Sequence, residues 1–366
     1  MKKNDIVGKI KSIFKNYVNV GPKTIIGIDL GINSIKMIEM QELRGGKFKI
    51  LKFGAESLPE GAIIEDEIQN PEVVLSAIKN IVEKTKIIAK NACIGVAGAN
   101  TVVRKLQLAG GSAEEIEDQV FWEAEQYLPF EMDDANVTYH VYGENAGGGV
   151  EILMAAAKKD LVYGFKQLLD GIDYRVKIVD LNALALLNVF EHVLNKDLVE
   201  NENIIFMDIG AQRSTFIIFN NFKVSFCKEI GIGGMMVTEE IQRQLGVNFE
   251  EAQNLKIVSD KNGNLPEEVL EVVDDVLEIF FKEIKKTIDF FMTAVSDEKF
   301  AECWITGGGS LTSNLREGLE VVLGMPIKYL DPLSVIEYSS SLDKKDLDYI
   351  RNRGAVVLGL GMRNRK

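Results

Sequence analysis

The sequence predicts an α/β fold in which two duplicated lobes surround a nucleotide cleft, and three observations predict it. An apolar strand that ends in Asp-x-Gly occurs twice, in residues 25–36 (IIGIDLGINSIK) and residues 204–215 (IIFMDIGAQRST), half a chain apart as in a duplicated unit. A late apolar strand runs directly into the glycines at 307–309. Between the copies, residues 92–179 predict a β-α-β-β-α-β order, which is typical of a separate α+β insert.

The composition excludes several classes of function. With 366 residues, 46% of them hydrophobic and 27% charged, the chain can build two packed cores and is too apolar for disorder. The net charge of −13 would repel phosphates, so we expect no nucleic-acid partner. The two His and the three distant cysteines cannot build a zinc site. Cys93, Cys227 and Cys303 lie in apolar runs, which predicts buried thiols in a reducing compartment.

The start of the chain predicts a short basic amphipathic helix over residues 6–18, because apolar residues and lysines alternate there at helical spacing. Two interpretations stay open: the helix docks on its own domain, or it contacts an anionic membrane or a partner. We expect no secretory signal, and no run reaches the roughly 18 apolar residues that span a bilayer.

The predicted organisation has four parts. They are an amphipathic segment (1–22), a first lobe (23–202) with the insert at 92–179, a second lobe (203–353) with a helical subdomain at 236–299, and a return to the first lobe (354–366).

The Asp-x-Gly turns carry the predicted chemistry. An Asp at the carboxyl end of a strand lies at the sheet edge where α/β folds bind ligands. Its carboxylate can hold a hydrated Mg²⁺, and the following Gly lets backbone N–H groups approach phosphate oxygens. One such turn is a common signal, whereas two matching copies predict that Asp29 and Asp208 face one metal-bound triphosphate. Lys36 either adds a positive charge to the first turn or packs against its strand.

The late glycines predict a third part of the site. In residues 304–310 (WITGGGS) a strand ends in three glycines, and a helix capped near Thr312 follows. Glycines let a flat ligand lie against bare backbone, and a helix N-terminus favours anionic groups. The sequence contains neither the P-loop nor the Rossmann glycine pattern.

These three motifs, in this order, resemble the phosphate 1, phosphate 2 and adenosine motifs of the actin, sugar kinase and chaperone ATPase superfamily over residues 24–362. Within it, residues 126–141 (QYLPFEMDDANVTYHV), 231–241 and 250–256 resemble the PilM family of type IV pilus assembly proteins. The insert is shared by that family and the FtsA division proteins. The resemblance implies an actin-like ATPase fold, with the insert as subdomain 1C.

The resemblance also implies the residues of the site. The first phosphate turn would use Asp29, Gly31, Asn33, Ser34 and Lys36, and the second phosphate turn would use Asp208, Gly210, Ser214 and Thr215. Gly233 and Gly234 would lie near the nucleotide, and Gln253 and Lys256 would lie at the ribose. The base and the α-phosphate would lie against Gly307, Gly308, Gly309 and Ser310. Gln253 departs from the Glu that is frequent there but still accepts a ribose hydroxyl. Asp29 and Asp208 would hold Mg²⁺ through water. Asp180, which opens the predicted helix DLNALAL, would either orient the attacking water or cap that helix.

The implied function is a cytoplasmic, ATP- and Mg²⁺-binding component of the type IV pilus inner-membrane platform, with weak or no hydrolysis. Its implied partners are the cytoplasmic tail of PilN, bound between the first lobe and the insert, and the platform and motor proteins; a homo-oligomer stays open. The alternatives are an FtsA-like filament protein at the membrane and a small-molecule kinase. The end of the chain, 362–366, has no apolar face of the FtsA kind, which favours the pilus interpretation.

The helix of the insert leaves one question open. Ile116, Val120, Ala124 and Tyr127 form a stripe at helical spacing, with Phe121 and Trp122 beside it. The stripe predicts either core packing or the lining of a partner groove.

Overall fold

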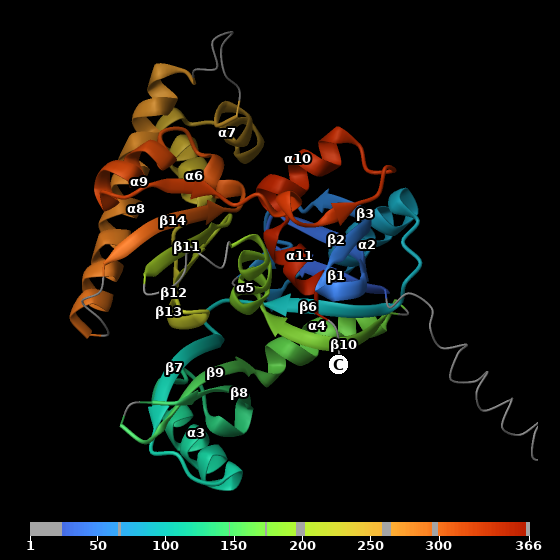
Figure 1. The fold of residues 1–366 in the computed structure, drawn as a ribbon. Helices are drawn as coiled ribbons and strands as arrows, with labels where there is room; N and C mark the ends of the chain where they lie inside the picture. The colour runs from blue at the N-terminus through green and yellow to red at the C-terminus, as the bar shows by residue number, and fades with distance from the viewer. Residues whose placement is uncertain are drawn as a thin grey trace, which may run out of the picture.

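The computed structural model describes residues 24–64, 67–145, 147–172, 174–194, 202–257, 265–294 and 299–363. The predicted helix over 6–18 lies outside these residues. Figure 1 shows two lobes side by side and a smaller body beneath them. Within the described part of the chain, no helix combines the length and the apolar character that crossing a bilayer requires.

The first lobe is built on a six-stranded sheet of order β10-β6-β1-β2-β3-β16. Its strands are β1 (Thr24–Leu30), β2 (Ser34–Glu42), β3 (Phe48–Ser57), β6 (Asn91–Val96), β10 (Arg175–Leu181) and β16 (Glu337–Tyr338). β1 runs antiparallel to β2 and parallel to β6. Strands flanked on both sides and covered on their faces read as continuous apolar runs, which explains the sequence of β1.

The second lobe repeats this plan in a five-stranded sheet of order β13-β12-β11-β14-β15. Its strands are β11 (Asn203–Ile209), β12 (Ser214–Asn220), β13 (Lys223–Ile230), β14 (Phe300–Thr306) and β15 (Ile327–Tyr329). β11 runs antiparallel to β12 and parallel to β14, as β1 does with β2 and β6. Asp29 pairs in register with Lys36, and Asp208 pairs with Thr215 at the equivalent place. The predicted duplication of the strand–turn–strand unit is therefore confirmed.

Helices cover both sheets. In the first lobe α2 (Pro71–Thr85) packs against β2 and β3. The second lobe carries α6 (Gly234–Leu245), α7 (Phe249–Leu255), the long α8 (Glu267–Ala294) and α9 (Leu315–Leu323). The apolar faces of α6 and α8 pack in one core with β11, β12 and β14. The chain returns to the first lobe at β16, which pairs with β3, earlier than the predicted residue 354. α10 (Lys344–Arg353) follows, and its Ile350 is buried in the core of the first lobe.

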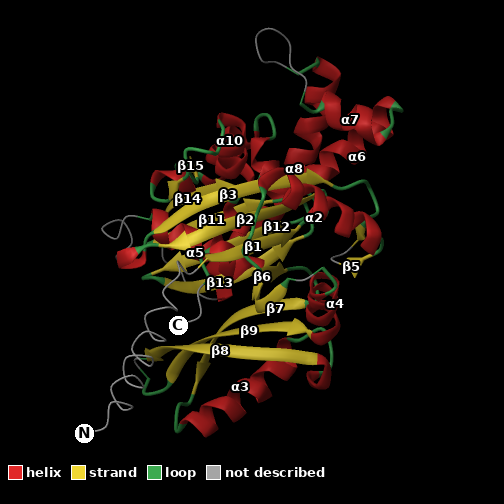
Figure 2. Ribbon diagram, turned by 90° about the vertical axis from the view of Figure 1, so that its right-hand side faces the viewer, coloured by secondary structure: helices red, strands yellow, loops and turns green. Residues whose placement is uncertain are grey.

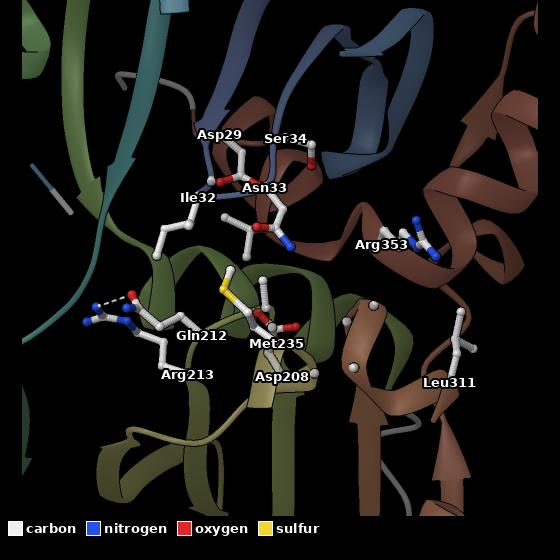
Figure 3. Close-up of a pocket in the computed structure, with 18 of the residues that line it drawn as sticks. Asp29, Ile32, Asn33, Ser34, Asp208, Gln212, Arg213, Met235, Leu311 and Arg353 are labelled. Carbon is white, nitrogen blue, oxygen red and sulfur yellow. Dashed lines mark hydrogen bonds between the residues drawn. The ribbon is translucent and has the colours of Figure 1, made fainter. Parts of the chain in front are cut away.

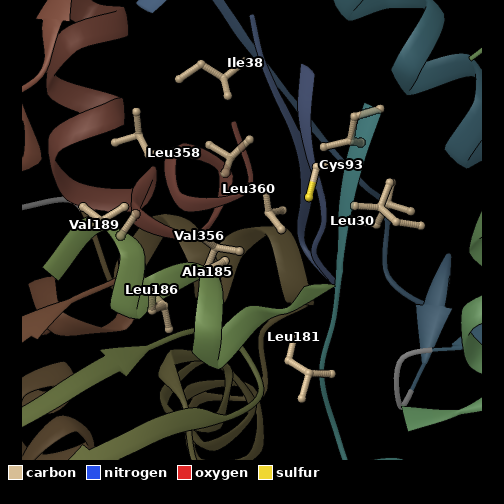
Figure 4. Packing of buried hydrophobic residues seen from close by; sticks show 14 of the residues in the cluster. Leu30, Ile38, Cys93, Leu181, Ala185, Leu186, Val189, Val356, Leu358 and Leu360 are labelled. Atoms are coloured by element: carbon tan, nitrogen blue, oxygen red, sulfur yellow. The ribbon is translucent and has the colours of Figure 1, made fainter. Parts of the chain in front are cut away.

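Two buried helices, α5 (Asn182–Val193), which connects the lobes, and α11 (Ala355–Gly361), pack against each other (Figure 4). α11 also packs on β1, where a Cβ at Gly27 would lie 2.4 Å from the carbonyl oxygen of Val357. Phe190 of α5 stacks on Phe206 of β11, with ring centroids 4.7 Å apart. The apolar surface of α5 therefore serves both lobes.

A Gly359→Ala substitution should destabilise this junction. A Cβ at Gly359 would lie 1.8 Å from the carbonyl oxygen of Ala185, so one of the two helices must move. Overpacking of a dense core costs about 1–3 kcal/mol. We expect urea unfolding to show a decrease in the free energy of unfolding that reaches at least the upper part of that range. Gly164→Ala is the control, because nothing lies within 4 Å of its Cβ, and an equal loss in both variants would contradict the packing argument.

The insert is a three-stranded sheet of order β7-β9-β8 (Figure 2). It consists of β7 (Thr101–Leu108), α3 (Ala113–Tyr127), β8 (Ala135–Glu144) and β9 (Val150–Lys158), and α4 (Lys159–Asp170) follows. The predicted β-α-β-β-α-β order of residues 92–179 lacks one strand, because β6 and β7 both precede α3. The first and last strands of this range, β6 and β10, pair within the sheet of the first lobe. Their apolar residues are buried between β1 and the helices, so they belong to that core.

The stripe on α3 packs into the core of the insert, where Val120 and Ala124 are fully buried. Phe121 and Trp122 point to solvent, and Trp122 is 65% exposed. The prediction that the stripe packs in a core is therefore correct for its two middle residues, Val120 and Ala124.

Candidate functional site

A cavity of about 530 Å³ lies between the lobes, where the equivalent turns of the two sheets meet (Figure 3). The β1–β2 turn borders one side and the β11–β12 turn the other, so that Asp29 and Asp208 approach it from opposite directions. The start of α6, the glycine turn after β14 and the end of α10 close the rest. The cavity is thus bounded by the three predicted motifs.

Each of the two turns is closed by the same backbone hydrogen bond. The Gly31 N–H donates to the Ser34 carbonyl oxygen (3.2 Å), and the Gly210 N–H donates to the Arg213 carbonyl oxygen (3.0 Å). A Cβ would lie 3.0 Å from the same oxygen at Gly31 and 2.9 Å at Gly210. The Asp-x-Gly pattern therefore fixes a tight turn in each lobe, with no room for a side chain.

The two aspartates differ in their surroundings. Lys36 donates to Asp29 across the strand pair at 2.8 Å, and both side chains are largely buried. Burial alone would lower the pKa of Lys36, but Asp29 and the other acidic groups hold it above its usual value. At the equivalent place Asp208 faces Thr215 instead of a lysine. Burial, followed by the charge of Asp29, raises the pKa of Asp208 to about 7. The first turn is therefore internally neutralised, and the second is not.

The start of α6 rests on the second turn. The Gly234 N–H donates to the Gly210 carbonyl (3.0 Å), and the Met235 N–H donates to the Ala211 carbonyl (2.7 Å). A Cβ at Gly233 would lie 2.5 Å from the Ala211 carbonyl oxygen. Gly233 is therefore a packing residue behind the cavity, whereas Gly234 lines it.

Lys256, at the end of α7, reaches the same helix start. Its Nζ donates to the Gly234 carbonyl and to Thr238 Oγ1, both at 2.8 Å. Burial, and then the nearby Arg353, lower its pKa to about 8. Two cations that face one cavity favour an anionic ligand between them.

The glycine turn after β14 (Gly308–Leu311) lies against the second Asp-x-Gly turn. Gly307 has φ +88°, and a Cβ there would lie 2.2 Å from Asp208 Oδ1. Gly307, Gly308 and Gly309 line the cavity, whereas Ser310 is buried and donates to the Gly307 carbonyl (2.7 Å). The helix predicted after these glycines is α9, which begins at Leu315 with Asn314, and not Thr312, at its N-cap.

The structure gathers most of the predicted site residues around this cavity. They are Asp29, Gly31, Asn33, Ser34, Lys36, Asp208, Gly210, Thr215, Gly234, Gln253, Lys256, Gly307, Gly308 and Gly309. It leaves Ser214, Gly233, Ser310 and Asp180 outside the lining. Ser214 is fully buried and donates to the Ile232 carbonyl (2.7 Å), so it secures the turn from behind.

Asp180 does not begin the connecting helix. It lies in β10, its carboxylate pairs with Arg363, and α5 begins two residues later at Asn182. Burial raises the pKa of Asp180 although Arg363 opposes the shift. Asn182 lines the cavity instead, and its buried Oδ1 has no hydrogen-bond partner among the described residues. A Cβ at Gly95 would lie 2.0 Å from this oxygen, so Gly95 makes room for the amide.

Sequence reasoning missed several other lining residues. Gln212 and Arg213 follow Gly210 in the second turn, so their position in the motif could have revealed them. Tyr349 and Arg353 come from α10, which carries no motif. The Tyr349 hydroxyl donates to Ser34 Oγ (3.3 Å), and the Arg353 guanidinium carbon lies 5.5 Å from the centroid of the Tyr349 ring.

Within the described residues, no group of three or more His, Cys, Asp or Glu side chains gathers to hold a metal directly. Of the three cysteines predicted to be buried, Cys93 and Cys303 are, and burial raises their pKa values. Cys227 is partly exposed, and burial followed by Glu229 raises its pKa to about 12. All three are free thiols.

A second cavity of about 690 Å³ lies where the first lobe, the insert and β13 meet. Residues 98–104, which enter β7, form one side, and residues 227–231 of β13 and its end form another. Tyr127, the last member of the α3 stripe, also lines it. β7 is an edge strand of the insert sheet, β13 is an edge strand of the sheet of the second lobe, and these two strands contact each other.

Comparison with known proteins gives the same architecture. The family model described as type IV pilus assembly protein PilM matches residues 27–365. A structure of a PilM-PilN type IV pilus biogenesis complex is 20% identical, covers 93% of this chain and 98% of the compared chain, and has a TM-score of 0.80. Ethanolamine utilization protein EutJ from Carboxydothermus hydrogenoformans is 11% identical over 94% and 91% of the two chains, with a TM-score of 0.57. A diol dehydratase-reactivating factor in nucleotide-free form is 10% identical over 92% and 98%, with a TM-score of 0.50. The fold is the actin-like ATPase fold.

Proposed function

Because this chain belongs to the PilM family of type IV pilus assembly proteins, we propose that it is the cytoplasmic nucleotide-binding component of a pilus assembly platform. In this proposal it binds ATP with Mg²⁺ between the lobes and the cytoplasmic tail of PilN beside the insert. It links the platform to the assembly motor. The observation that carries the proposal is the convergence of two equivalent Asp-x-Gly turns on one cavity.

The cavity suits a nucleotide triphosphate. The closed turns at Gly31 and Gly210 leave bare backbone on both sides of the site, where phosphate oxygens can approach N–H groups. The glycines at 307–309 offer a flat surface for the base, next to Gln253 and Lys256 for the ribose. Arg353 and Lys256 add positive charge for the phosphates.

Mg²⁺ fits the acidic side of the cavity. Asp208 has a raised pKa, so the residues around it leave its carboxylate incompletely neutralised, and a cation would lower that pKa. Hard divalent cations keep several waters and bind through one or two carboxylates plus phosphate oxygens. Asp208 and Asp29 would hold the hydrated ion, which would neutralise phosphate charge. Asn182, which lines the same cavity, would lie near the bound nucleotide.

The second cavity suits the PilN tail. It lies at the junction of first lobe and insert, where the family resemblance implies the tail binds. The edge strands β7 and β13 can accept an extended peptide by adding a strand, a common mode of peptide recognition. The PilM-PilN complex, which has the same fold, supports PilN as the partner.

Two titrations test the proposal. The purified chain should bind Mg-ATP, and it should bind a synthetic peptide of the PilN cytoplasmic tail from the same genome. Failure to bind the peptide, with and without Mg-ATP, would reject the adaptor function, and failure to bind any adenine nucleotide would reject the cleft assignment.

Nucleotide affinity should fall at alkaline pH. The pKa of Lys256 is about 8, so the ammonium group is lost as the pH rises above that value, and with it an attraction for phosphate. We expect the Kd of ATP to rise several-fold between pH 7 and pH 9.5. In a Lys256→Arg variant, which stays charged, the dependence should be much weaker. An identical pH profile in both proteins would contradict the assignment.

A further inference from the structure

The two cavities share one wall. Gln212 and Arg213, from the second Asp-x-Gly turn, line both of them. At the end of β6, Ala97 faces the cavity between the lobes and Gly98 faces the second one. Neighbouring residues of one segment therefore belong to different cavities.

Neighbouring residues at the start of α5 also line different cavities. Asn182 lines the cavity between the lobes, whereas Leu181 and Ala183 line the second cavity. If a ligand in one cavity displaces any of these segments, the shape of the other cavity must change, because the segments between the cavities are closely packed.

Glu229 binds two of the segments that separate the cavities. Its Oε2 accepts a hydrogen bond from the Gly98 N–H (2.9 Å) and pairs with Arg213 Nη1 (3.2 Å). Gly98 has φ +99° and begins the connection from β6 to the insert, where its carbonyl accepts the Thr101 N–H (2.9 Å). One carboxylate from the second lobe thus holds both the second phosphate turn and the root of the insert.

The position of Arg213 depends on the phosphate turn. Its carbonyl closes that turn by accepting the Gly210 N–H. A guanidinium beside a polyphosphate exchanges carboxylate for phosphate readily, because both accept the same paired N–H donors. Glu229 and a bound triphosphate therefore compete for the same side chain.

We propose that Glu229 is a positioning residue that couples the occupancy of the two cavities through Arg213 and Gly98. A triphosphate draws Arg213 away from Glu229, and the carboxylate then holds Gly98 alone, which changes the second cavity. Thermodynamic linkage requires the reverse effect as well: a ligand in the second cavity changes nucleotide affinity by the same factor. This inference rests on the proposed function, because it takes a nucleotide as the first ligand.

A thermodynamic cycle tests the proposal in the full chain. The Kd of the PilN tail peptide is measured with and without saturating Mg-AMPPNP, in the native chain and in Glu229→Gln. Gln keeps the acceptor for Gly98 but not the charge that attracts Arg213. We expect the two Kd values to differ by a factor of about five or more in the native chain, within the usual range of allosteric coupling, and to be nearly equal in the variant. Glu229 lines the second cavity, so its substitution can itself change the affinity for the peptide. The readout is therefore the ratio of the Kd values with and without Mg-AMPPNP, and not either Kd alone.

Glu151→Gln is the matched control. Glu151 also joins insert and second lobe, through Lys223 (2.8 Å) and alongside Lys105 (2.9 Å), but it lines neither cavity. It should keep the native ratio. A ratio near one in the native chain, or an unchanged ratio in Glu229→Gln, overturns the coupling while leaving both binding sites in place.

Amide hydrogen exchange gives a readout that does not need the peptide. The Gly98 amide should exchange several-fold more slowly when Mg-AMPPNP binds the native chain, and this change should be absent in Glu229→Gln. Bound nucleotide without any change at Gly98 overturns the proposal even if the tail peptide does not bind. If Mg-AMPPNP does not bind at all, the cleft assignment fails and the coupling fails with it.

Discussion

An Asp208→Asn variant is expected to lose affinity for Mg-ATP by roughly 100-fold, which corresponds to about 2.7 kcal/mol. The amide keeps the shape of the side chain against Gly307 but cannot attract the hydrated cation. The same variant should be more stable than the native chain when no nucleotide is present. A single substitution that weakens binding and strengthens folding separates a ligand-binding role from a structural one.

The gain in stability follows from the raised pKa of Asp208. Folding raises this pKa from its ordinary value of 3.8 to about 7, so the folded state favours the protonated acid. Stability is therefore lost as the pH rises from about 4 to about 7, and the native chain carries the full penalty at pH 8. Asn carries none. We expect Asp208→Asn to raise the unfolding temperature at pH 8 and to make little difference near pH 4.

The equivalent change in the first lobe should act in the opposite direction on stability. Asp29→Asn removes the partner of Lys36 and leaves a buried ammonium group without its carboxylate. Breaking a buried pair from one side costs about 3–5 kcal/mol. Thermal unfolding and nucleotide titration of both variants at pH 8 check these expectations. Destabilisation by Asp208→Asn, or full nucleotide affinity in it, would contradict the assignment of the second turn.

The repeated turn was predictable because its residues are fixed by local geometry. An apolar strand, an Asp at its end and a Gly that tolerates no side chain are visible in the letters of the chain. The duplicated units have equivalent strand pairing in the two lobes. The late glycines were predictable for the same reason, since Gly307 has a backbone conformation that favours Gly.

The side chains around the turn were less predictable, because their direction depends on the pleat and on helix boundaries. Ser214 and Thr215 are adjacent in β12, so they point to opposite faces, and only Thr215 reaches the cavity. Asp180 and Asn182 exchange roles because β10 extends two residues further than the apolar pattern suggested. Arg353 enters the site only through the packing of α10, for which no local pattern exists.

A Gly231→Trp variant is expected to lose affinity for the PilN tail by roughly 100-fold or more while it keeps nucleotide binding. Gly231 lines the second cavity, and no atom lies within 4 Å of its Cβ, so a large side chain enters open space without strain. An indole ring would occupy the volume between β7 and β13 that an extended peptide needs. Excluding a peptide sterically removes most of its binding energy, because its main-chain hydrogen bonds and side-chain contacts depend on the same space.

Gly164→Trp is the matched control for this experiment. Gly164 lies on α4, its Cβ is equally free of neighbours, and it lines neither cavity. The two variants thus add the same apolar ring at open positions. A difference in their affinity for the tail peptide is therefore caused by the position of the ring and not by its chemistry. Isothermal titration with the tail peptide should give native affinity for Gly164→Trp and little or no binding for Gly231→Trp. Native affinity in Gly231→Trp would mean that the tail binds elsewhere, and equal losses in both variants would assign the effect to the added ring and not to the cavity.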